Sequence, residues 1–342
     1  SSLVNYSVET KRLRMGVQGS YKFNAINNSI LVVSAGVKTE QFNSNEPISR
    51  LSNLFSSLLF EKNFMKLYDK SFAKVNYSME LFNGVNFNSS FSYEKRKALF
   101  NTTDYVIFPK EEVDYTSNNP LDPDAIDTAA FSNHDLLKFN LGLRIRFGEK
   151  FMTYPDIKVS ITSSKYPRLF LDYTKGFNSS ISDYNFDHLH ARIQQRVNLK
   201  SIGVYKYNLL AGTFFENKTL SFIDYKHFNG NQTYTKLNAN YLSSFKNLAY
   251  YDYSTSGDYF EYHSEHNFKG YILGKIPYIN KLNYNLILGL HGISRIGKYP
   301  YIEFNIGVSN LGWKKYRFLR LDYVLSQVNG KRNEALMFGL SF

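Results

Sequence analysis

The segment DYFEYHSEH, residues 258–266, is the part of the sequence richest in possible metal ligands. In an extended strand Glu261, His263 and Glu265 share one face, because alternate residues point the same way. Neighbours on that face are about 6.5–7 Å apart, too far for one strand to hold a metal ion tightly. A metal site would need further ligands from an adjacent strand, so we interpret the segment as a hydrogen-bonded polar face.

Two further histidines, His188 and His190, also share one face of an expected strand. They too could contribute to a metal site or belong to a hydrogen-bonded polar face. A hydrolase would need a serine, a histidine and an acid in one place. The G-x-S-x-G sequence that presents a nucleophilic serine does not occur in this chain. We therefore expect no enzyme activity, no catalytic residue, no metal site and no cofactor.

Basic residues form the most informative polar set. The basic positions expected on the polar face of the strands are Arg14, Lys74, Lys138, Arg144, Arg146, Arg168, Arg192, Arg196 and Arg320. Acidic positions there are fewer and include Glu80, Asp172, Glu261, Glu303 and Asp322. Such a face could select anions or hold an inserted acidic loop such as 110–127, but a network of cross-strand ion pairs is the favoured interpretation. Arg320 and Asp322, two residues apart, are expected to form one such pair.

These side chains share a face only if the chain forms long strands, which alternation of polar and apolar residues indicates. The alternation occurs in 13–23, 30–40, 71–82, 85–95, 136–147, 168–177, 186–197, 204–215, 282–291, 301–308, 319–325 and 333–342, and less regularly in 237–245 and 257–268. About 14 strands, within a range of 12–16, of spanning length predict a transmembrane antiparallel β-barrel. A soluble β-sandwich would also alternate, but should show turn signals every 8–12 residues or so.

The chain ends in NEALMFGLSF, residues 333–342. One side of an extended strand would carry Leu336, Phe338, Leu340 and Phe342. The other side would carry small or only moderately hydrophobic residues. A soluble strand rarely ends by burying a phenylalanine at its last position. We therefore predict that this run is the closing strand of the barrel.

Composition supports a membrane barrel. Tyr, Phe and Trp make up 17% of the chain, as expected if aromatic girdles lie at the membrane interfaces. The mean hydropathy is −0.36 and no apolar run approaches about 18 residues, which excludes α-helical spans. The net charge of +12 is spread singly between apolar residues rather than clustered, which disfavours a nucleic-acid surface. No cysteine is present, so disulfides are excluded.

Strand counting gives an expected orientation. If the C-terminus lies in the periplasm, the short links at 82–84, 199–203 and 327–332 face outside. The long connections 43–70, 99–134 and 216–236 then face the periplasm, the reverse of ordinary porins. An error of one strand would reverse the assignment of every connection upstream of it.

The connection 43–70 contains one expected helix. In PISRLSNLFSSLLFEKN, Ile48, Leu51, Leu54, Phe55 and Leu58 recur at helical spacing, and Asn45 or Pro47 is the start signal. We predict a short amphipathic helix that plugs the mouth of the barrel or lies on the membrane surface, with the mouth favoured. The acidic segment 110–135 lacks alternation and is expected to be a loop.

Several stretches resemble a Bacteroidetes outer-membrane β-barrel family described as carboxypeptidase-regulatory-like, with a large domain of unknown function. They are EKNFMKLYDKSF (61–72), SSKYPRLFLDYTKGF (163–177), HFNGNQTY (227–234), SEHNFKGYILGKIPYINKL (264–282) and FLRLDY (318–323). The resemblance implies an immunoglobulin-like domain ahead of the barrel, which this sequence lacks, and no peptidase activity. FLRLDY followed by a strand ending in Phe is also similar to the end of outer-membrane assembly-factor barrels.

We therefore expect residues 1–342 to form a single outer-membrane β-barrel domain with its C-terminus in the periplasm. The first interpretation is a non-enzymatic subunit or scaffold of a larger complex for protein or lipoprotein assembly or export. Its partners would be the lipid bilayer and other outer-membrane proteins or lipoproteins, with no nucleic acid. The alternative is a transport channel whose basic lumen selects anionic or oligosaccharide solutes. The start, SSLVNYSVET, is expected to be that of a processed or truncated chain.

Overall fold

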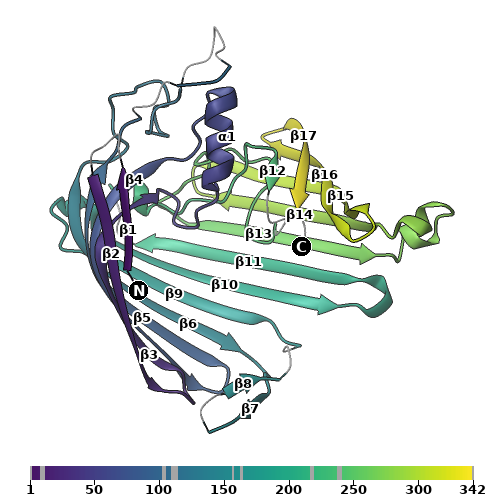
Figure 1. The fold of residues 1–342 in the computed structure, drawn as a ribbon, viewed down its shortest axis with the longest axis horizontal. Helices are drawn as coiled ribbons and strands as arrows, with labels where there is room; N and C mark the ends of the chain where they lie inside the picture. Colours follow the sequence, from purple (N-terminus) through teal and green to yellow (C-terminus); the bar gives the residue numbers. More distant parts are fainter. Residues whose placement is uncertain are drawn as a thin grey trace. The chain divides into compact units, whose positions relative to one another are not determined.

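A computed structural model describes residues 2–7, 12–101, 105–108, 115–155, 158–161, 165–215, 219–236 and 241–340, with the side chains of 2–7, 12, 13 and 160 left out. Strands dominate it (Figure 1). They are β1 (Ser2–Ser7), β2 (Arg12–Asn24), β3 (Ser29–Gln41), β4 (Leu67–Phe82), β5 (Val85–Ala98), β6 (His134–Arg146), β7 (Phe151–Thr153), β8 (Lys158–Ser160), β9 (Arg168–Phe177), β10 (Phe186–Asn198), β11 (Val204–Phe215), β12 (Thr235–Lys236), β13 (Tyr259–Lys269), β14 (Asn285–Arg295), β15 (Lys298–Trp313), β16 (Tyr316–Val328) and β17 (Lys331–Leu340).

The large sheet follows the order of the chain. Over the described residues it has fifteen strands in the order β1-β2-β3-β4-β5-β6-β9-β10-β11-β13-β14-β15-β16-β17-β12, and β7 and β8 form a separate hairpin. Only β12 breaks the up-and-down pattern, because it pairs in parallel with the outer edge of β17. Without β12 the sheet has fourteen strands, so the expectation of about fourteen antiparallel strands is confirmed.

One expected strand is wrong. Residues 241–245 of the predicted strand 237–245 form turns and irregular backbone, and 237–240 lie outside the described residues. The count is nevertheless reached, because β1 adds a strand at the N-terminal end that alternation did not identify. The pattern around residue 245 reflects burial on both sides rather than a half-buried strand, since the consecutive residues Ser244, Phe245 and Lys246 are all buried.

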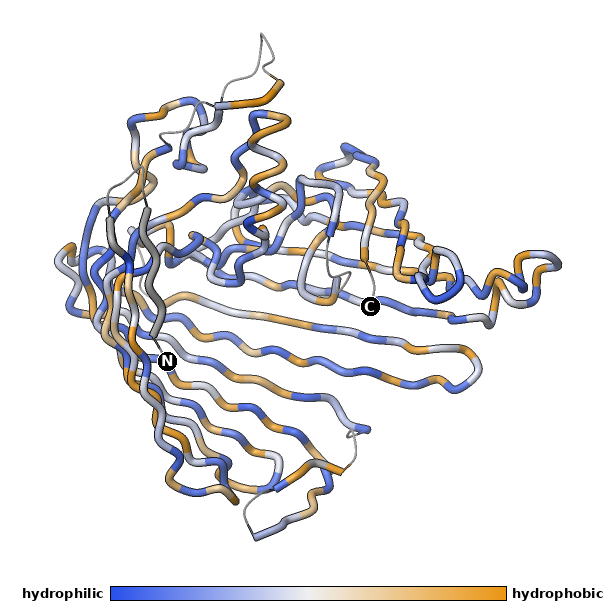
Figure 2. The backbone as a smooth tube through the Cα atoms, viewed as in Figure 1, coloured by the Kyte–Doolittle hydropathy of each residue, from blue (hydrophilic) through white to orange (hydrophobic). Residues whose placement is uncertain are grey.

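Period-two burial follows the polar–apolar alternation along the strands (Figure 2). In β15, Tyr301, Glu303 and Asn305 are buried, whereas Ile302 is 51% exposed and Phe304 is 41% exposed. The polar side chains therefore lie on the covered face and the apolar ones on the open face. This inverts the pattern of a soluble sheet and is typical of strands that face lipid.

The C-terminal strand β17 shows the same inversion. Leu336 and Phe338 are 47% and 56% exposed, whereas Ala335 and Met337 pack against Val324 of β16 in a small buried cluster. Leu340 is half-buried, and Phe342 lies outside the described residues. The predicted alternation therefore holds as far as residue 340.

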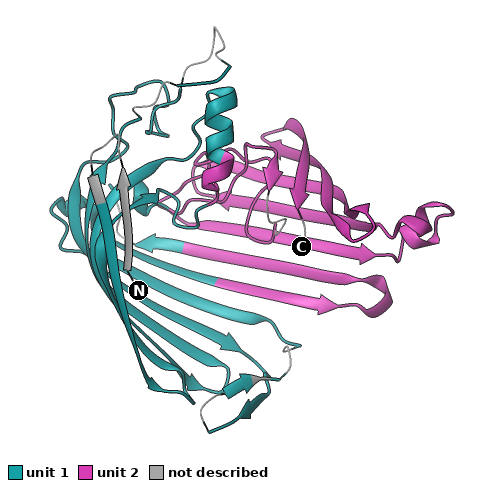
Figure 3. Cartoon of the chain, viewed as in Figure 1, with its two compact units in different colours: residues 1–46, 53–191, 213–225 teal, residues 47–52, 192–212, 226–342 magenta. Residues whose placement is uncertain are grey.

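The chain divides into two compact units (Figure 3). Unit 1 comprises residues 1–46, 53–191 and 213–225, and unit 2 comprises 47–52, 192–212 and 226–342. Strands β10 and β11 contribute residues to both. In unit 1 the aromatic core is built around Phe42, whose ring lies 5.8 Å from that of Phe131 and 6.3 Å from that of Phe222.

Replacing the expected strand 237–245 by β1 changes the orientation argument. Between the C-terminus and every connection before β13 there is now one strand fewer than expected. Counting back from β17 therefore places each of these connections on the other side of the membrane. With a periplasmic C-terminus, the long connections within 43–70, 99–134 and 216–236 are assigned to the outside, and the links at 82–84 and 199–203 to the periplasm. The strand count behind the prediction for these connections is thus corrected, whereas the counting for 327–332 is unchanged. On which side of the membrane each connection lies stays a prediction.

The expected helix is α1 (Arg50–Phe60). Its start signal is neither Asn45 nor Pro47, because the Oγ atom of Ser49 accepts a hydrogen bond of 3.0 Å from the backbone N–H of Ser52. Leu51 and Phe55 are 60% and 61% exposed, so the apolar side is uncovered. A plug would cover that side, and the exposure favours the membrane-surface alternative. Among the described residues, no helix is both long and apolar enough to cross a membrane.

The loop expected at 110–135 is irregular from residue 115 to residue 133, and residues 134–135 already belong to β6. It is held to the start of β4 by Asn118, whose side-chain amide donates to the carbonyl of Leu67 and accepts from the N–H of the same residue. Beside it, the Nζ atom of Lys66 donates to Oγ1 of Thr116 at 2.9 Å and to the carbonyl of Ser117.

Lys66 should make the stability of this loop depend on pH. Burial lowers the pKa of Lys66 to about 8 from its ordinary 10.5. Between these values the unfolded chain binds more protons, so the free energy of unfolding rises with pH, by up to about 3 kcal/mol. We expect urea unfolding in detergent micelles to show this rise for the native chain and not for Lys66→Met. Parallel curves for the two proteins between pH 7 and pH 10 would contradict it.

Candidate functional site

The segment 226–258, which leads into β13, folds onto the polar side of unit 2. Lys226 and Thr255 exchange backbone hydrogen bonds of 2.8 and 3.0 Å, and the N–H of Phe245 donates to the carbonyl of Asn229. Gly230 permits this close packing, because a Cβ atom there would lie 2.4 Å from the carbonyl oxygen of Leu248. We call 226–258 the inserted segment; residues 237–240 within it are outside the description.

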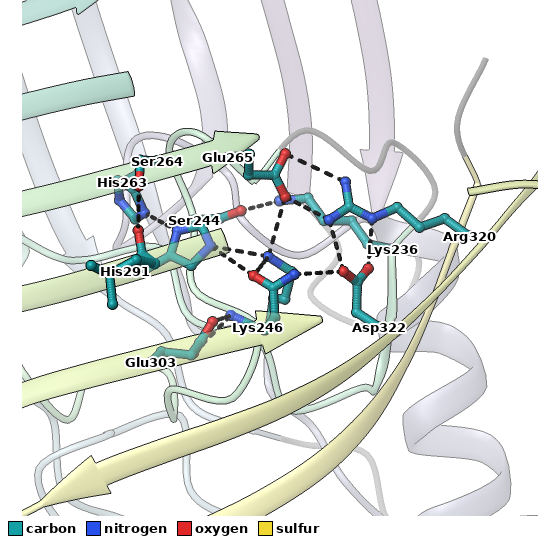
Figure 4. A network of polar contacts seen from close by, with 12 residues as sticks. Lys236, Ser244, Lys246, His263, Ser264, Glu265, His291, Glu303, Arg320 and Asp322 are labelled. Atoms are coloured by element: carbon teal, nitrogen blue, oxygen red, sulfur yellow. Dashed lines mark hydrogen bonds and ion pairs between the residues drawn. The ribbon is translucent and has the colours of Figure 1, made fainter. Parts of the chain in front are cut away.

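Lys246 is the central side chain of the inserted segment and is fully buried (Figure 4). Its Nζ atom donates to Oδ1 of Asn305 at 3.0 Å and lies 3.5 Å from Oε1 of Glu265. The backbone N–H groups of Lys246 and Asn247 donate to the carboxylate of Glu303 at 2.8 and 2.9 Å. Both the side chain and the backbone at this point are thus held by buried acceptors on strands.

Arg320 completes the network from β16. Its Nε atom lies 2.6 Å from Oδ2 of Asp322, and its Nη2 atom lies 2.5 Å from Oε1 of Glu265. Asn305 also donates to Asp322, at 2.7 Å. Glycines on neighbouring strands make room for these groups, since a Cβ atom on Gly307 would lie 2.2 Å from Oδ1 of Asp322. The pair Arg320–Asp322 is therefore one part of a larger network.

The segment 258–266 contributes to this network. Nε2 of His263 lies 2.8 Å from Oε1 of Glu261, and Nδ1 of His263 lies 2.9 Å from Nδ1 of His291. Glu261 also lies 3.2 Å from the Nζ atom of Lys226. Among the described residues, no group of three or more His, Asp or Glu side chains is arranged to hold a metal ion. The carboxylates here serve as partners for cations of the inserted segment and β16.

The other histidine pair lies in unit 1. The rings of His188 and His190 are 5.2 Å apart, and His188 stacks on Phe214 at 4.1 Å. Nε2 of His190 lies 3.3 Å from Oδ2 of Asp172. These contacts are stacking and hydrogen bonding on a half-exposed face.

A second buried network anchors residues 219–225 within unit 1. The guanidinium of Arg96 contacts both Asp224 and Glu94, with Nη2–Oε2 of Glu94 at 2.7 Å, and the Nζ atom of Lys138 lies 3.5 Å from Asp224. Burial would raise the pKa of Asp224, but the positive charges of Arg96 and Lys138 hold it below its ordinary value. Asp224 is thus one acid that meets this basic face, and residues 110–114 of the expected loop 110–127 lie outside the described residues.

The predicted basic residues do not come together in one site. Lys138 joins Arg96 and Asp224, and Arg320 joins Lys246 and Glu265. Arg144, Arg146 and Arg168 lie together at the opposite ends of β6 and β9 from Lys138, with Arg146 directly opposite Arg168. Arg192 is half-buried and Arg196 is exposed on β10.

Sequence reasoning missed Lys246, Arg96 and Asp224. Lys246 directly follows the expected strand 237–245, and Arg96 belongs to the run EKRK, which resembles a solvated cluster. The available signal was the lack of clean alternation around Lys246, which indicates that this stretch contributes no regular strand. Buried ion pairs between residues 128 positions apart, such as Arg96 and Asp224, leave no local pattern.

Both networks hold a non-strand segment against the polar face by fully buried charges. Such charges are stable only where nearly all their hydrogen-bonding groups are satisfied. The geometry therefore defines an anchor for the segment between β11 and β13, built from ionic and hydrogen-bonded contacts.

The fold is similar to that of known membrane barrels. The crystal structure of BamA from Haemophilus ducreyi lacking POTRA domains 1–3 superposes with a TM-score of 0.51 and 9% identity, over 95% of this chain and 60% of that chain. CdiB from Acinetobacter baumannii gives 0.45 and 11%, over 97% of this chain and 51% of that chain. The toluene transporter TodX from Pseudomonas putida gives 0.26 and 8%, over 96% and 81%. The likeness to BamA identifies the fold as a transmembrane antiparallel β-barrel, and the chain spans about three fifths of the BamA chain.

Residues 1–308 match the family described as "Family of unknown function (DUF5686) C-terminal domain", and the chain belongs to this family. The predicted resemblance to a family with a large domain of unknown function is confirmed to this extent. A Bacteroidetes origin and the carboxypeptidase-regulatory description stay predictions. The comparison with curated proteins found no match.

Proposed function

We propose that the chain is a non-enzymatic outer-membrane β-barrel that acts as a subunit or scaffold of a larger complex for protein or lipoprotein assembly or export. The observation that carries the proposal is the inserted segment, which covers the polar face of β13 to β16. It is held there by Lys246, whose Nζ atom donates to Asn305, and by Tyr241, whose ring centre lies 4.9 Å from the Arg320 guanidinium. A covered polar face disfavours a water-filled passage along this part of the sheet. It favours a role in which a partner protein recognises the wall of the barrel itself.

The outer edge of β17 supports recognition by a partner. Its partner β12 pairs only with Phe338 and Gly339, through the register Thr235–Phe338 and Lys236–Gly339. Within unit 2, no further strand of the described residues pairs with the outer edge of Lys331 to Met337. Strand edges are common sites for pairing with another chain. The similarity of FLRLDY to assembly-factor barrels is consistent with this role.

The alternative is a transport channel for anionic or oligosaccharide solutes. It is favoured by one observation, an open cavity in unit 1 lined by Arg144 and Arg146. Both proposals place the chain in the outer membrane with its C-terminus in the periplasm.

The test begins with extraction of the native protein in a mild detergent and mass spectrometry of the proteins that stay bound. We expect stoichiometric outer-membrane proteins or lipoproteins, and low conductance of the purified barrel in planar bilayers. Lys246→Met should raise conductance by releasing the inserted segment, whereas the control Lys175→Met, in an exposed pair that does not touch this segment, should not. A lone native barrel with high, anion-selective conductance would replace the first proposal with the channel.

A further inference from the structure

A cavity of about 650 Å³ lies on the polar side of unit 1 and is separate from both anchoring networks. Its walls come from β3, β4, β5, β6 and β9, together with the β7–β8 hairpin. The ring of Phe151 in that hairpin makes cation–π contacts with two side chains. The Nζ atom of Lys158 lies 4.4 Å from its centre, and the Arg146 guanidinium lies 5.5 Å from it. The hairpin is fixed there because Lys158 pairs with Glu80 at 2.7 Å.

Three arginines converge beside this cavity. Arg146 of β6 and Arg168 of β9 are directly opposite each other in the ladder, and Arg144 lies two residues along on the same face. Residues directly opposite on adjacent strands have Cβ atoms about 4.5–5.5 Å apart, and like charges at such positions are destabilising. The cluster is therefore a local excess of positive charge that the fold itself does not favour.

The carboxylates nearby neutralise only part of that excess. Arg146 pairs with Glu149 at 2.7 Å, but Arg144 donates to the neutral amide oxygen of Asn86 at 2.9 Å. Within the described part of the chain, neither Arg144 nor Arg168 has a carboxylate within ion-pair distance. One further acid, Asp172, lines the cavity. Its Oδ2 atom lies 3.3 Å from Nε2 of His190, and its Oδ1 atom lies 2.9 Å from the position that a Cβ atom on Gly142 would take. Among the described residues, which do not include Asp156, the charges of Arg144, Arg168 and Asp172 leave an excess of one positive charge.

We propose that this arginine cluster, Arg144, Arg146 and Arg168, binds the phosphate group of an anionic ligand. Guanidinium groups present paired N–H donors that match the oxygens of a phosphate, and several can share one phosphate because it has three terminal oxygens. The phenyl faces of Phe151 and Phe170 line the same cavity and leave room for an uncharged part of the ligand. This site does not depend on the function proposed above.

The test is isothermal titration of the purified full chain in detergent with inorganic pyrophosphate at fixed chloride concentration. We expect saturable binding, weakened about 10- to 100-fold by Arg144→Gln or by Arg168→Gln, since each removes a charge-assisted hydrogen bond. Asp172→Asn should tighten binding, a gain that misfolding cannot produce. Lys298→Gln removes the same charge from an exposed pair in unit 2 and should leave binding unchanged.

Competition then identifies the source of the phosphate. Displacement of pyrophosphate by glycerol 3-phosphate but not by short-chain phosphatidylglycerol supports a soluble phosphate ligand, and the opposite result supports a lipid headgroup. Absence of pyrophosphate binding, or native affinity in both Arg144→Gln and Arg168→Gln, overturns the proposal. Unchanged affinity in Asp172→Asn would also contradict the charge balance on which it rests.

Discussion

Arg320→Met is expected to destabilise the protein by about 3–5 kcal/mol, because removing one partner leaves buried charges uncompensated. Arg320 is 4% exposed and contacts two carboxylates, Glu265 and Asp322, of which Asp322 is completely buried. Methionine preserves most of the volume but none of the donors. The measurement is the midpoint of urea unfolding in detergent micelles, converted to free energy with the slope of the native chain.

Two comparisons isolate the electrostatic cause. Lys298→Met breaks a pair whose side chains are 36% and 52% exposed, and should cost about 0–1 kcal/mol. Adding Asp322→Asn to Arg320→Met should recover part of the loss, because one uncompensated carboxylate is removed. If the double variant is as unstable as the sum of its parts, the loss comes from packing rather than charge.

Arg96→Met is expected to have an effect of the same size, about 3–5 kcal/mol, in unit 1. Arg96 is 2% exposed and joins Glu94 of its own strand to Asp224 of the segment before β12. Its loss leaves Lys138, at 3.5 Å, as the cation paired with Asp224 among the described residues. We also expect residues 219–225 to become cleavable by protease in the folded variant, because their anchor to β5 is lost.

The matched control for Arg96 is Lys175→Met, which breaks an exposed pair with Asp187 on neighbouring strands. It should change the unfolding midpoint little and leave 219–225 protected. A variant Arg96→Met that unfolds like the native chain, with the segment still protected, would show that Asp224 does not hold this segment.

If both predictions hold, the segment between β11 and β13 is locked at two places by buried charges. That supports a barrel whose polar side is permanently covered in this part and agrees with a scaffold role. If the charges prove dispensable, the covering is weak, and the channel proposal gains weight.

The strands were determined by the sequence itself. Alternation at period two located every expected strand except 237–245, because a strand in lipid must place apolar side chains on one face along its whole length. The same rule placed Arg320 and Asp322 on the covered face of β16 and Leu336 and Phe338 on the open face of β17. It failed at β1, whose six residues are too few for a clear alternating pattern.

Only the tertiary structure decided what covers the polar face and which charges meet. Lys246 and Glu303 are 57 positions apart, and Arg96 and Asp224 are 128 apart, so no local period records either contact. The described part of the inserted segment follows no period because it is buried from several sides, and that also explains the strand wrongly expected at 237–245. Local sequence specifies a strand by its two faces, whereas the partners of a buried charge are chosen by the folded chain as a whole.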